Sequence, residues 1–165
     1  MITVNLSEMP EDGIQISGQT EQDIFELDPA DKEVSVAGPL EYDLHVSDVG
    51  GDLLLAQGQL VAPFTLRCVA CLEDFPFTLY LEPYAADFDR PASGVLDLTE
   101  RIREDILLEL PGYPHCDREN DDTEHTCPAA GRYSIADKDT PGNAEDPGQG
   151  PSAWDALDGL PKKDS

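Results

Sequence analysis

Basic side chains are scarce in this sequence, which has 10 Lys and Arg against 35 Asp and Glu and a formal net charge of −25 over 165 residues. Nucleic-acid phosphates and anionic lipid repel such a chain, so simple electrostatic attraction to either is excluded. Residues 1–112 alone carry 23 acidic and 5 basic side chains, so the acidity is not confined to a tail. Such a surface is typical either of a solvated, aggregation-resistant protein or of one that attracts a basic partner.

Long apolar runs are also lacking. The longest apolar clusters, at residues 53–56 and 106–110, are far shorter than the ~20 residues of a membrane-spanning helix, so we expect no membrane partner. The N-terminal residues include neither a basic opening nor an apolar core, which predicts no export or transit signal. We therefore expect a cytoplasmic protein, in which disulfides rarely persist and cysteines are more often metal ligands or buried thiols.

Residue patterns typical of enzymes are missing as well. Gly50 and Gly51 are followed by Asp52 and Leu53 rather than by a lysine and a helix, so they do not form a phosphate-binding loop. No serine has the context of a nucleophile elbow, and no pair of carboxylates is singled out for acid–base catalysis. We expect a protein that is not an enzyme and has no small-molecule substrate.

Alternation of apolar and polar residues, the pattern of half-buried strands, dominates the first part of the chain. The longest alternating run extends from Leu54 to Cys68, and because it is long for one strand we expect a bulge or bend at Gly58 or Pro63. The pattern predicts an α+β fold. It consists of an antiparallel β-meander, forming a curved sheet or partly open barrel, with one main helix packed on it and a largely irregular C-terminal tail.

The main helix is predicted over residues 97–110. Asp97 and Glu100 have the spacing of a capping box, and Pro111 and Gly112 end the pattern. Apolar residues recur at every fourth position and form one stripe, made of Leu98, Ile102, Ile106 and Leu110. A weaker helical pattern covers residues 20–27.

The composition divides the chain into four regions. Residues 1–112 form the β-rich core with its helix, and residues 113–133 form a cysteine-containing loop that we expect to dock on that core. Residues 134–151 are acidic and crowded with Pro and Gly, which predicts a disordered linker. Residues 152–160 have the pattern of a short apolar docking helix, carrying Trp154, Leu157 and Leu160. This helix docks either on its own core or on another protein.

Cys68 and Cys71 are separated by two residues at an expected tight turn, where both sulfurs can bind one ion. A redox dithiol has the same spacing but needs a following helix to lower the thiol pKa. Pro76 stands where that helix would form, within a strand-like segment, so the redox-catalyst interpretation is disfavoured. Cys116 and Cys127 can complete a tetrahedral set.

Three interpretations of the four cysteines remain. The first is a structural zinc site that uses all of Cys68, Cys71, Cys116 and Cys127. The second is a site for another metal or with a partial ligand set. The third has no metal, with the first pair buried as small apolar residues and the second pair exposed. His115 and His125 are more typical of solvated loop histidines than of ligands.

The order of these features resembles the YceD family, described as large ribosomal RNA subunit accumulation proteins. The resemblance covers roughly residues 30–132 and rests on the run Cys68-Val-Ala-Cys71-Leu-Glu-Asp-Phe75, on the helix that ends Leu-Glu-Leu-Pro111, and on the cysteine-bearing tail. Residues 154–160 are similar to the family's usual terminal segment. Many members end in a Cys-Pro-x-Cys-Gly motif. This chain departs from it, because Ala130 follows Cys127-Pro128-Ala129 where the second cysteine would be.

The resemblance implies a role in building the large ribosomal subunit or in keeping its RNA, without implying catalysis. A basic ribosomal or assembly protein is the partner that the charge favours. A direct RNA contact would need a local basic patch, and the core offers only Lys32, Arg67, Arg90, Arg101 and Arg103 for it. The alternative function is a thiol- or zinc-based redox-sensing interaction module.

Overall fold

The computed structural model describes residues 1–20, 22–28 and 30–130 of the chain. These residues belong to one compact unit, Met1–Ser134, and the second unit, Ile135–Ser165, lies outside the described residues. The predicted linker over residues 134–151 and the predicted docking helix over residues 152–160 therefore lie outside them too, as do the last three residues of the predicted loop over 113–133.

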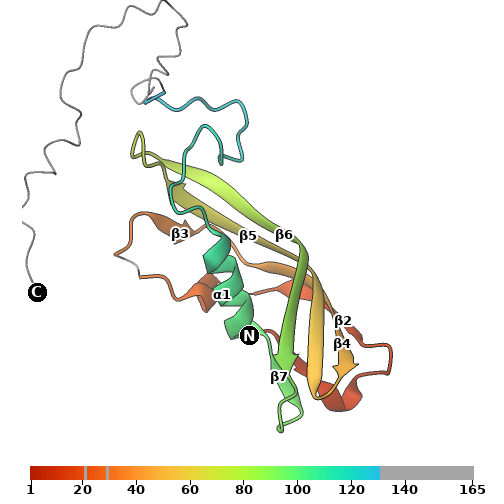
Figure 1. Cartoon of the computed structure of the whole chain (residues 1–165). Coiled ribbons are helices and arrows are strands. Elements are labelled where there is room, and N and C mark those ends of the chain that lie inside the picture. Colours follow the sequence, from red (N-terminus) through yellow and green to blue (C-terminus); the bar gives the residue numbers. More distant parts are fainter. Residues whose placement is uncertain (21, 29, 131–165) are drawn as a thin grey trace, which may run out of the picture. The chain divides into compact units, whose positions relative to one another are not determined.

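The main structure is a curled antiparallel sheet of five strands (Figure 1). Its long central strand β5 pairs along one edge with β6, and along the other edge with β4 and then with β3. The edge strand β2 pairs with β4. The strands are β2 (Ile14–Gln19), β3 (Val34–Val36), β4 (Glu41–Gly50), β5 (Leu53–Arg67) and β6 (Asp74–Asp89). Successive pairing of β4, β5 and β6 is the predicted meander, and the predicted α+β fold is confirmed.

The pairing of β5 with β6 is irregular at Gly58, where the register shifts between Gly58 and Leu60. A side chain at Gly58 would collide with the backbone oxygen of Asp43 on the neighbouring strand β4, so only glycine fits there. The irregularity predicted at Gly58 or Pro63 is therefore at the glycine, while Pro63 remains paired with Thr78. Bulges of this kind bend long strands and increase sheet twist.

The helix α1 (Thr99–Glu109) lies against the sheet, with Ile102 and Ile106 fully buried in the core. It begins two residues later than predicted, because Asp97 is the last residue of a short strand, β7 (Val95–Asp97). Strand β7 pairs with β1 (Thr3–Asn5) near the N-terminus. The Asp97 carboxylate accepts a hydrogen bond from the Thr99 N–H, at 2.9 Å. The N-cap residue is Leu98, which makes no side-chain cap hydrogen bond, so the predicted capping box of Asp97 and Glu100 does not form.

The remaining elements of the described residues are short. A 3₁₀ turn, η1, covers Leu6–Glu8, and a second, η2, covers Gln22–Phe25. The weak helical pattern over residues 20–27 therefore yields a single turn, which places Phe25 edge-on against Phe64 of β5, with ring centroids 5.1 Å apart. Among the residues that the structure describes, no helix has the length and apolar character needed to cross a membrane.

Candidate metal centre

The connection between β5 and β6, residues 68–73, forms a tight turn that carries the first two cysteines. The Cys68 N–H donates to the Glu73 carbonyl and the Leu72 N–H donates to the Cys68 carbonyl, both at 2.9 Å. Leu72 adopts a left-handed conformation, with φ of 64°. The Arg67 side chain donates from Nε to the Leu72 carbonyl, at 2.9 Å. The turn is therefore closed by backbone bonds, and it returns the chain into β6 rather than into a helix.

Residues 113–130, called the cysteine loop from here on, bind the end of the β5–β6 hairpin. The Val69 N–H donates to the Pro114 carbonyl at 2.9 Å, and the Asp121 N–H donates to the Pro76 carbonyl at 3.1 Å. The Asp121 carboxylate accepts from the backbone N–H and the hydroxyl of Thr78, at 2.9 and 2.7 Å. These bonds hold the loop's two cysteines against the turn.

The four cysteine sulfurs converge at this point and all lie within 4.8 Å of one another. The Sγ atoms of Cys68 and Cys127 are 4.0 Å apart, and those of Cys71 and Cys116 are 3.7 Å apart. All four cysteines are free thiols. Each close contact thus joins one cysteine of the turn to one cysteine of the loop, so the cluster bridges two segments distant in the sequence.

The spacing of the sulfurs fits a tetrahedral metal ion. Zinc–sulfur bonds of about 2.3 Å in a tetrahedron place neighbouring sulfurs about 3.8 Å apart. A disulfide, by contrast, would need an S–S distance of about 2.05 Å. The observed contacts of 3.7 and 4.0 Å lie close to the tetrahedral value. The donor set can therefore hold a metal ion, and four thiolates of this kind leave no open position for a substrate or for water.

Burial and backbone hydrogen bonds act differently on the thiols. Burial raises the pKa of Cys68, but the backbone N–H groups of Cys116, Cys71 and Ala70 stabilise its thiolate and lower that pKa to about 6. Burial raises the pKa of Cys71 and, more strongly, that of Cys116, which faces the other thiols of the cluster. Of these three thiols, only Cys68 loses its proton more readily than an ordinary cysteine. A bound cation would compensate the cost of deprotonating the others.

His125 also lies at the cluster, with its Nε2 atom 3.3 Å from the Sγ atom of Cys116. The interpretation of His125 as a solvated loop histidine is wrong, because its side chain is half-buried against the cluster. Its Nε2–H can donate to a Cys116 thiolate, which is how side chains around a metal site orient its ligands. The one signal in the sequence is its place two residues before Cys127. The sequence does not reveal the contact with Cys116, because the two residues are nine positions apart.

The structure brings together the four residues that the sequence singled out as metal ligands, Cys68, Cys71, Cys116 and Cys127. Ala130, at the position of the missing knuckle cysteine, is exposed and lies in the turn after Cys127, where its N–H donates to the Cys127 carbonyl. The loop contributes two thiols to the cluster, those of Cys116 and Cys127. Comparison of the chain with protein-family models, with curated proteins and with solved structures found no match.

Proposed function

We propose that this protein is a non-enzymatic cytoplasmic factor that supports assembly of the large ribosomal subunit and accumulation of its RNA. In this proposal a structural zinc ion, held by Cys68, Cys71, Cys116 and Cys127, fixes the cysteine loop to the β5–β6 hairpin. The observation that carries the zinc site is the convergence of four free thiols within 4.8 Å. The ribosomal role is supported by the resemblance of the sequence to the YceD family.

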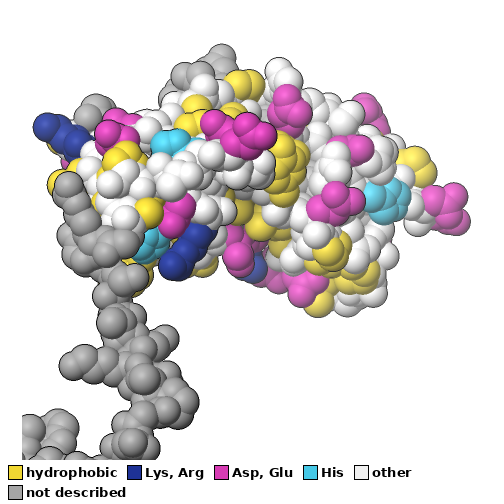
Figure 2. Space-filling view, turned by 90° about the horizontal axis from the view of Figure 1, so that it is seen from above, with side chains coloured by type: hydrophobic (Ala, Val, Ile, Leu, Met, Phe, Trp, Pro, Cys, Tyr) yellow, Lys and Arg dark blue, Asp and Glu magenta, His cyan; other side chains and the backbone are white. Residues whose placement is uncertain are grey.

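Charge supports a protein rather than RNA as the main partner. Of the six basic side chains in the described residues, four are in ion pairs with carboxylates, namely those of Arg67, Arg90, Arg101 and Arg103. They are therefore poorly placed to bind phosphates. Figure 2 shows acidic side chains spread over one face of the molecule, with Lys and Arg in few places. Such a surface attracts basic proteins, and this attraction weakens with salt.

Two measurements on the full chain test the proposal. Elemental analysis of the purified protein is expected to give about one zinc per chain, and Cys68→Ser is expected to lose it, because three thiolates and a hydroxyl bind zinc poorly. Affinity capture from a cell extract at low salt is expected to recover large-subunit precursors and to lose them at high salt. Capture without any ribosomal component would contradict the ribosomal role, and a metal-free protein would contradict the zinc site.

The thiol-based sensor is the second candidate function. Two observations favour it. The pKa of Cys68 is lowered to about 6, and its neighbour Cys71 is half-buried rather than fully enclosed, so an oxidant can approach the cluster from that side. A sensor of this kind would release its metal within minutes of exposure to dilute hydrogen peroxide and recover it on reduction. Thiols that retain the metal under these conditions would remove this alternative.

A further inference from the structure

One face of the five-stranded sheet packs against the core, and the opposite face does not. On the face toward α1, β4 and β5 contribute fully buried side chains such as Leu44 and Leu60, which belong to the same core as Ile102 and Ile106 of the helix. Residues at the alternate positions of the same strands point to the opposite face. In the described residues no element covers this second face where β2, β4 and β5 pair, so its side chains meet solvent.

The strand register places a defined set of side chains on this outer face. One row across the strands runs from Gln19 to Glu41, Val61 and Tyr80, and the next row contains Asp43 opposite Gln59. We call the set Gln19, Glu41, Asp43, Gln59 and Tyr80 the outer acidic face. Tyr80 is 69% exposed although it is aromatic. An exposed aromatic ring on an otherwise polar face is typical of a binding surface.

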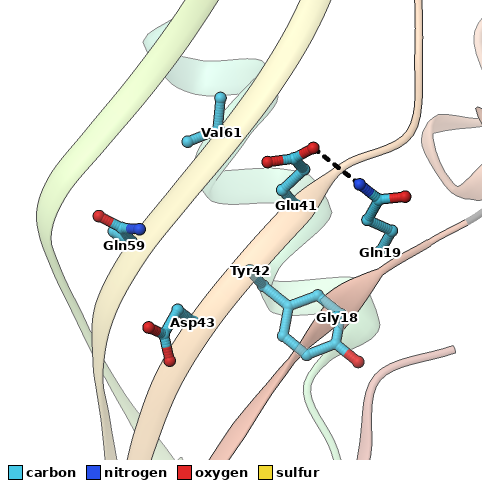
Figure 3. Close-up of a pocket in the computed structure, with 7 residues that line it drawn as sticks. All are labelled: Gly18, Gln19, Glu41, Tyr42, Asp43, Gln59 and Val61. Carbon is cyan, nitrogen blue, oxygen red and sulfur yellow. Dashed lines mark hydrogen bonds between the residues drawn. The ribbon is translucent and has the colours of Figure 1, made fainter.

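The two carboxylates of this face are held in position by glutamine side chains. Gln19 donates to the Glu41 carboxylate at 2.8 Å, drawn as the dashed line in Figure 3, and Gln15 donates to the Asp43 carboxylate. A hollow of about 300 Å³ is lined by Glu41, Asp43 and Gln59 among others (Figure 3). Two like charges beside one hollow repel each other, and a cation between them would relieve that repulsion.

Basic side chains are excluded from this side of the sheet. Strands β2, β3, β4 and β6 contain no Lys or Arg, and β5 contains only Arg67, its last residue, which is engaged with Asp74 and with the adjacent turn. The arginines of α1 lie on the other side of the sheet. A surface kept acidic only for solubility would mix the two signs. Apart from Arg67 at one end, the charged side chains of Lys, Arg, Asp and Glu on this face of β2, β4 and β5 are negative.

We propose that the outer acidic face binds an extended, arginine-bearing segment of a partner protein. One guanidinium occupies the hollow between Glu41 and Asp43, where two carboxylates offer charge-assisted hydrogen bonds. A second stacks on Tyr80, as guanidinium groups do on aromatic rings. Tyr80 lies two strands away from Glu41, about 10 Å at ordinary strand spacing. Arginines two or three residues apart in an extended segment span about 7 to 10 Å, which matches.

This inference deepens the proposed function, since it gives the basic partner a place to bind. The probe is a fluorescently labelled synthetic peptide in which arginine alternates with serine, added to the full chain at low ionic strength. The double variant Glu41→Gln with Asp43→Asn is expected to weaken peptide binding about tenfold. A charge-matched control, Glu8→Gln with Glu104→Gln, changes exposed carboxylates that are not on this face and is expected to weaken binding less than about twofold.

Tyr80 provides a second, uncharged test. Tyr80→Ala is expected to weaken peptide binding about threefold, whereas Tyr80→Phe, which keeps the ring, is expected to bind like the original protein. The inference is overturned if the two double variants bind the peptide equally, if both Tyr80 variants bind like the original protein, or if a single-stranded RNA competes better than the peptide. Circular dichroism of each variant confirms that the sheet is folded.

Different experimental results would contradict the ribosomal role and the peptide site. Capture of large-subunit precursors by the Glu41→Gln and Asp43→Asn double variant, at the level of the original protein, would overturn this site and leave the ribosomal role standing. Peptide binding that depends on Glu41, Asp43 and Tyr80, in a protein that captures no ribosomal component, would uphold the site and remove the ribosomal role.

Discussion

At the scale of the residue, the thiols of Cys68 and Cys116 have opposite shifts in pKa. Three backbone N–H groups donate toward Cys68 and outweigh the effect of its burial, so its pKa falls to about 6. Cys116 receives no such compensation, and burial raises its pKa. Among Cys68, Cys71 and Cys116, the Cys68 thiol therefore loses its proton most readily, and its sulfur is the natural first ligand for an arriving cation.

The acidity of Cys68 predicts a pH dependence of stability for the metal-free protein. A folded-state pKa below the unfolded value means that this thiolate stabilises the folded state above the unfolded pKa, and that the contribution is lost as pH falls through about 6. The free energy of unfolding is thus expected to decrease from pH 8 to pH 5 more steeply in the original protein than in Cys68→Ala. Urea unfolding of both proteins, freed of metal, measures this, and equal slopes would contradict it.

Leu72 gives a second prediction at the same scale. Its left-handed conformation, with φ of 64°, costs a non-glycine residue about 1 kcal/mol, and its side chain is 63% exposed, so little packing would be lost on removing it. Leu72→Gly is expected to raise the free energy of unfolding by a fraction of that amount. Asp52→Gly, at a similar φ of 63°, is the matched control and is expected to gain less, because aspartate tolerates this conformation better. Urea unfolding of both variants ranks them.

At the scale of the element, the β5–β6 hairpin connects the core to the cysteine cluster. Its strands continue through the irregularity at Gly58 and end at the turn that carries Cys68 and Cys71. Glycine is required at position 58 because the backbone oxygen of Asp43, on the paired strand β4, lies where a side chain would begin. The glycine therefore allows a bent strand to retain both neighbours.

Gly58→Ala is accordingly expected to destabilise the protein by several kcal/mol, or to prevent folding, since the new methyl group collides with backbone rather than with a flexible side chain. Gly112→Ala is the matched control, because nothing lies within 4 Å of the position that its methyl group would take. Thermal unfolding followed by circular dichroism compares the two. An unchanged melting temperature for Gly58→Ala would show that β4 can move aside.

The elements that could be predicted from the sequence are those with a clear local alternation of apolar and polar residues. Alternation predicts the first part of β6, where every second residue from Phe75 to Leu81 is apolar. It does not predict the second part, because the irregularity opposite Gly58 reverses which residues point inward. Strand β7 is missed because its three residues gain their partners only from β1, at the far end of the chain. The cysteines are found because few residue types bind zinc, whereas the contact of His125 with Cys116 depends on the path of the loop.

At the scale of the whole unit, the core of the sheet and helix extends well beyond the cysteine cluster, although Cys68, Cys116 and Cys127 are buried in the same set of residues. Leu44, Leu60 and Phe64 of the sheet are buried with Ile102 and Ile106 of α1. The cysteine loop, in contrast, contains no helix or strand in its described residues 113–130. It is held by a few hydrogen bonds to the hairpin and by its two cysteines. With the proposed ion bound, the order of this loop is expected to depend on it more than the order of the sheet does.

Removal of the metal tests this division directly. A strong chelator is expected to abolish hydrogen-exchange protection in residues 113–130 and in the turn at 68–73, because four deprotonated thiols can no longer share one cation and the loop loses its main attachment. The amides that pair β4 with β5 are expected to keep their protection. Asp121→Ala removes the two bonds to Thr78 and is expected to speed metal release, while Asp117→Ala, an exposed loop residue, serves as control. If the chelator instead unfolds sheet and loop together, the metal holds the entire unit rather than the loop. If it changes neither, the cluster binds no structural ion.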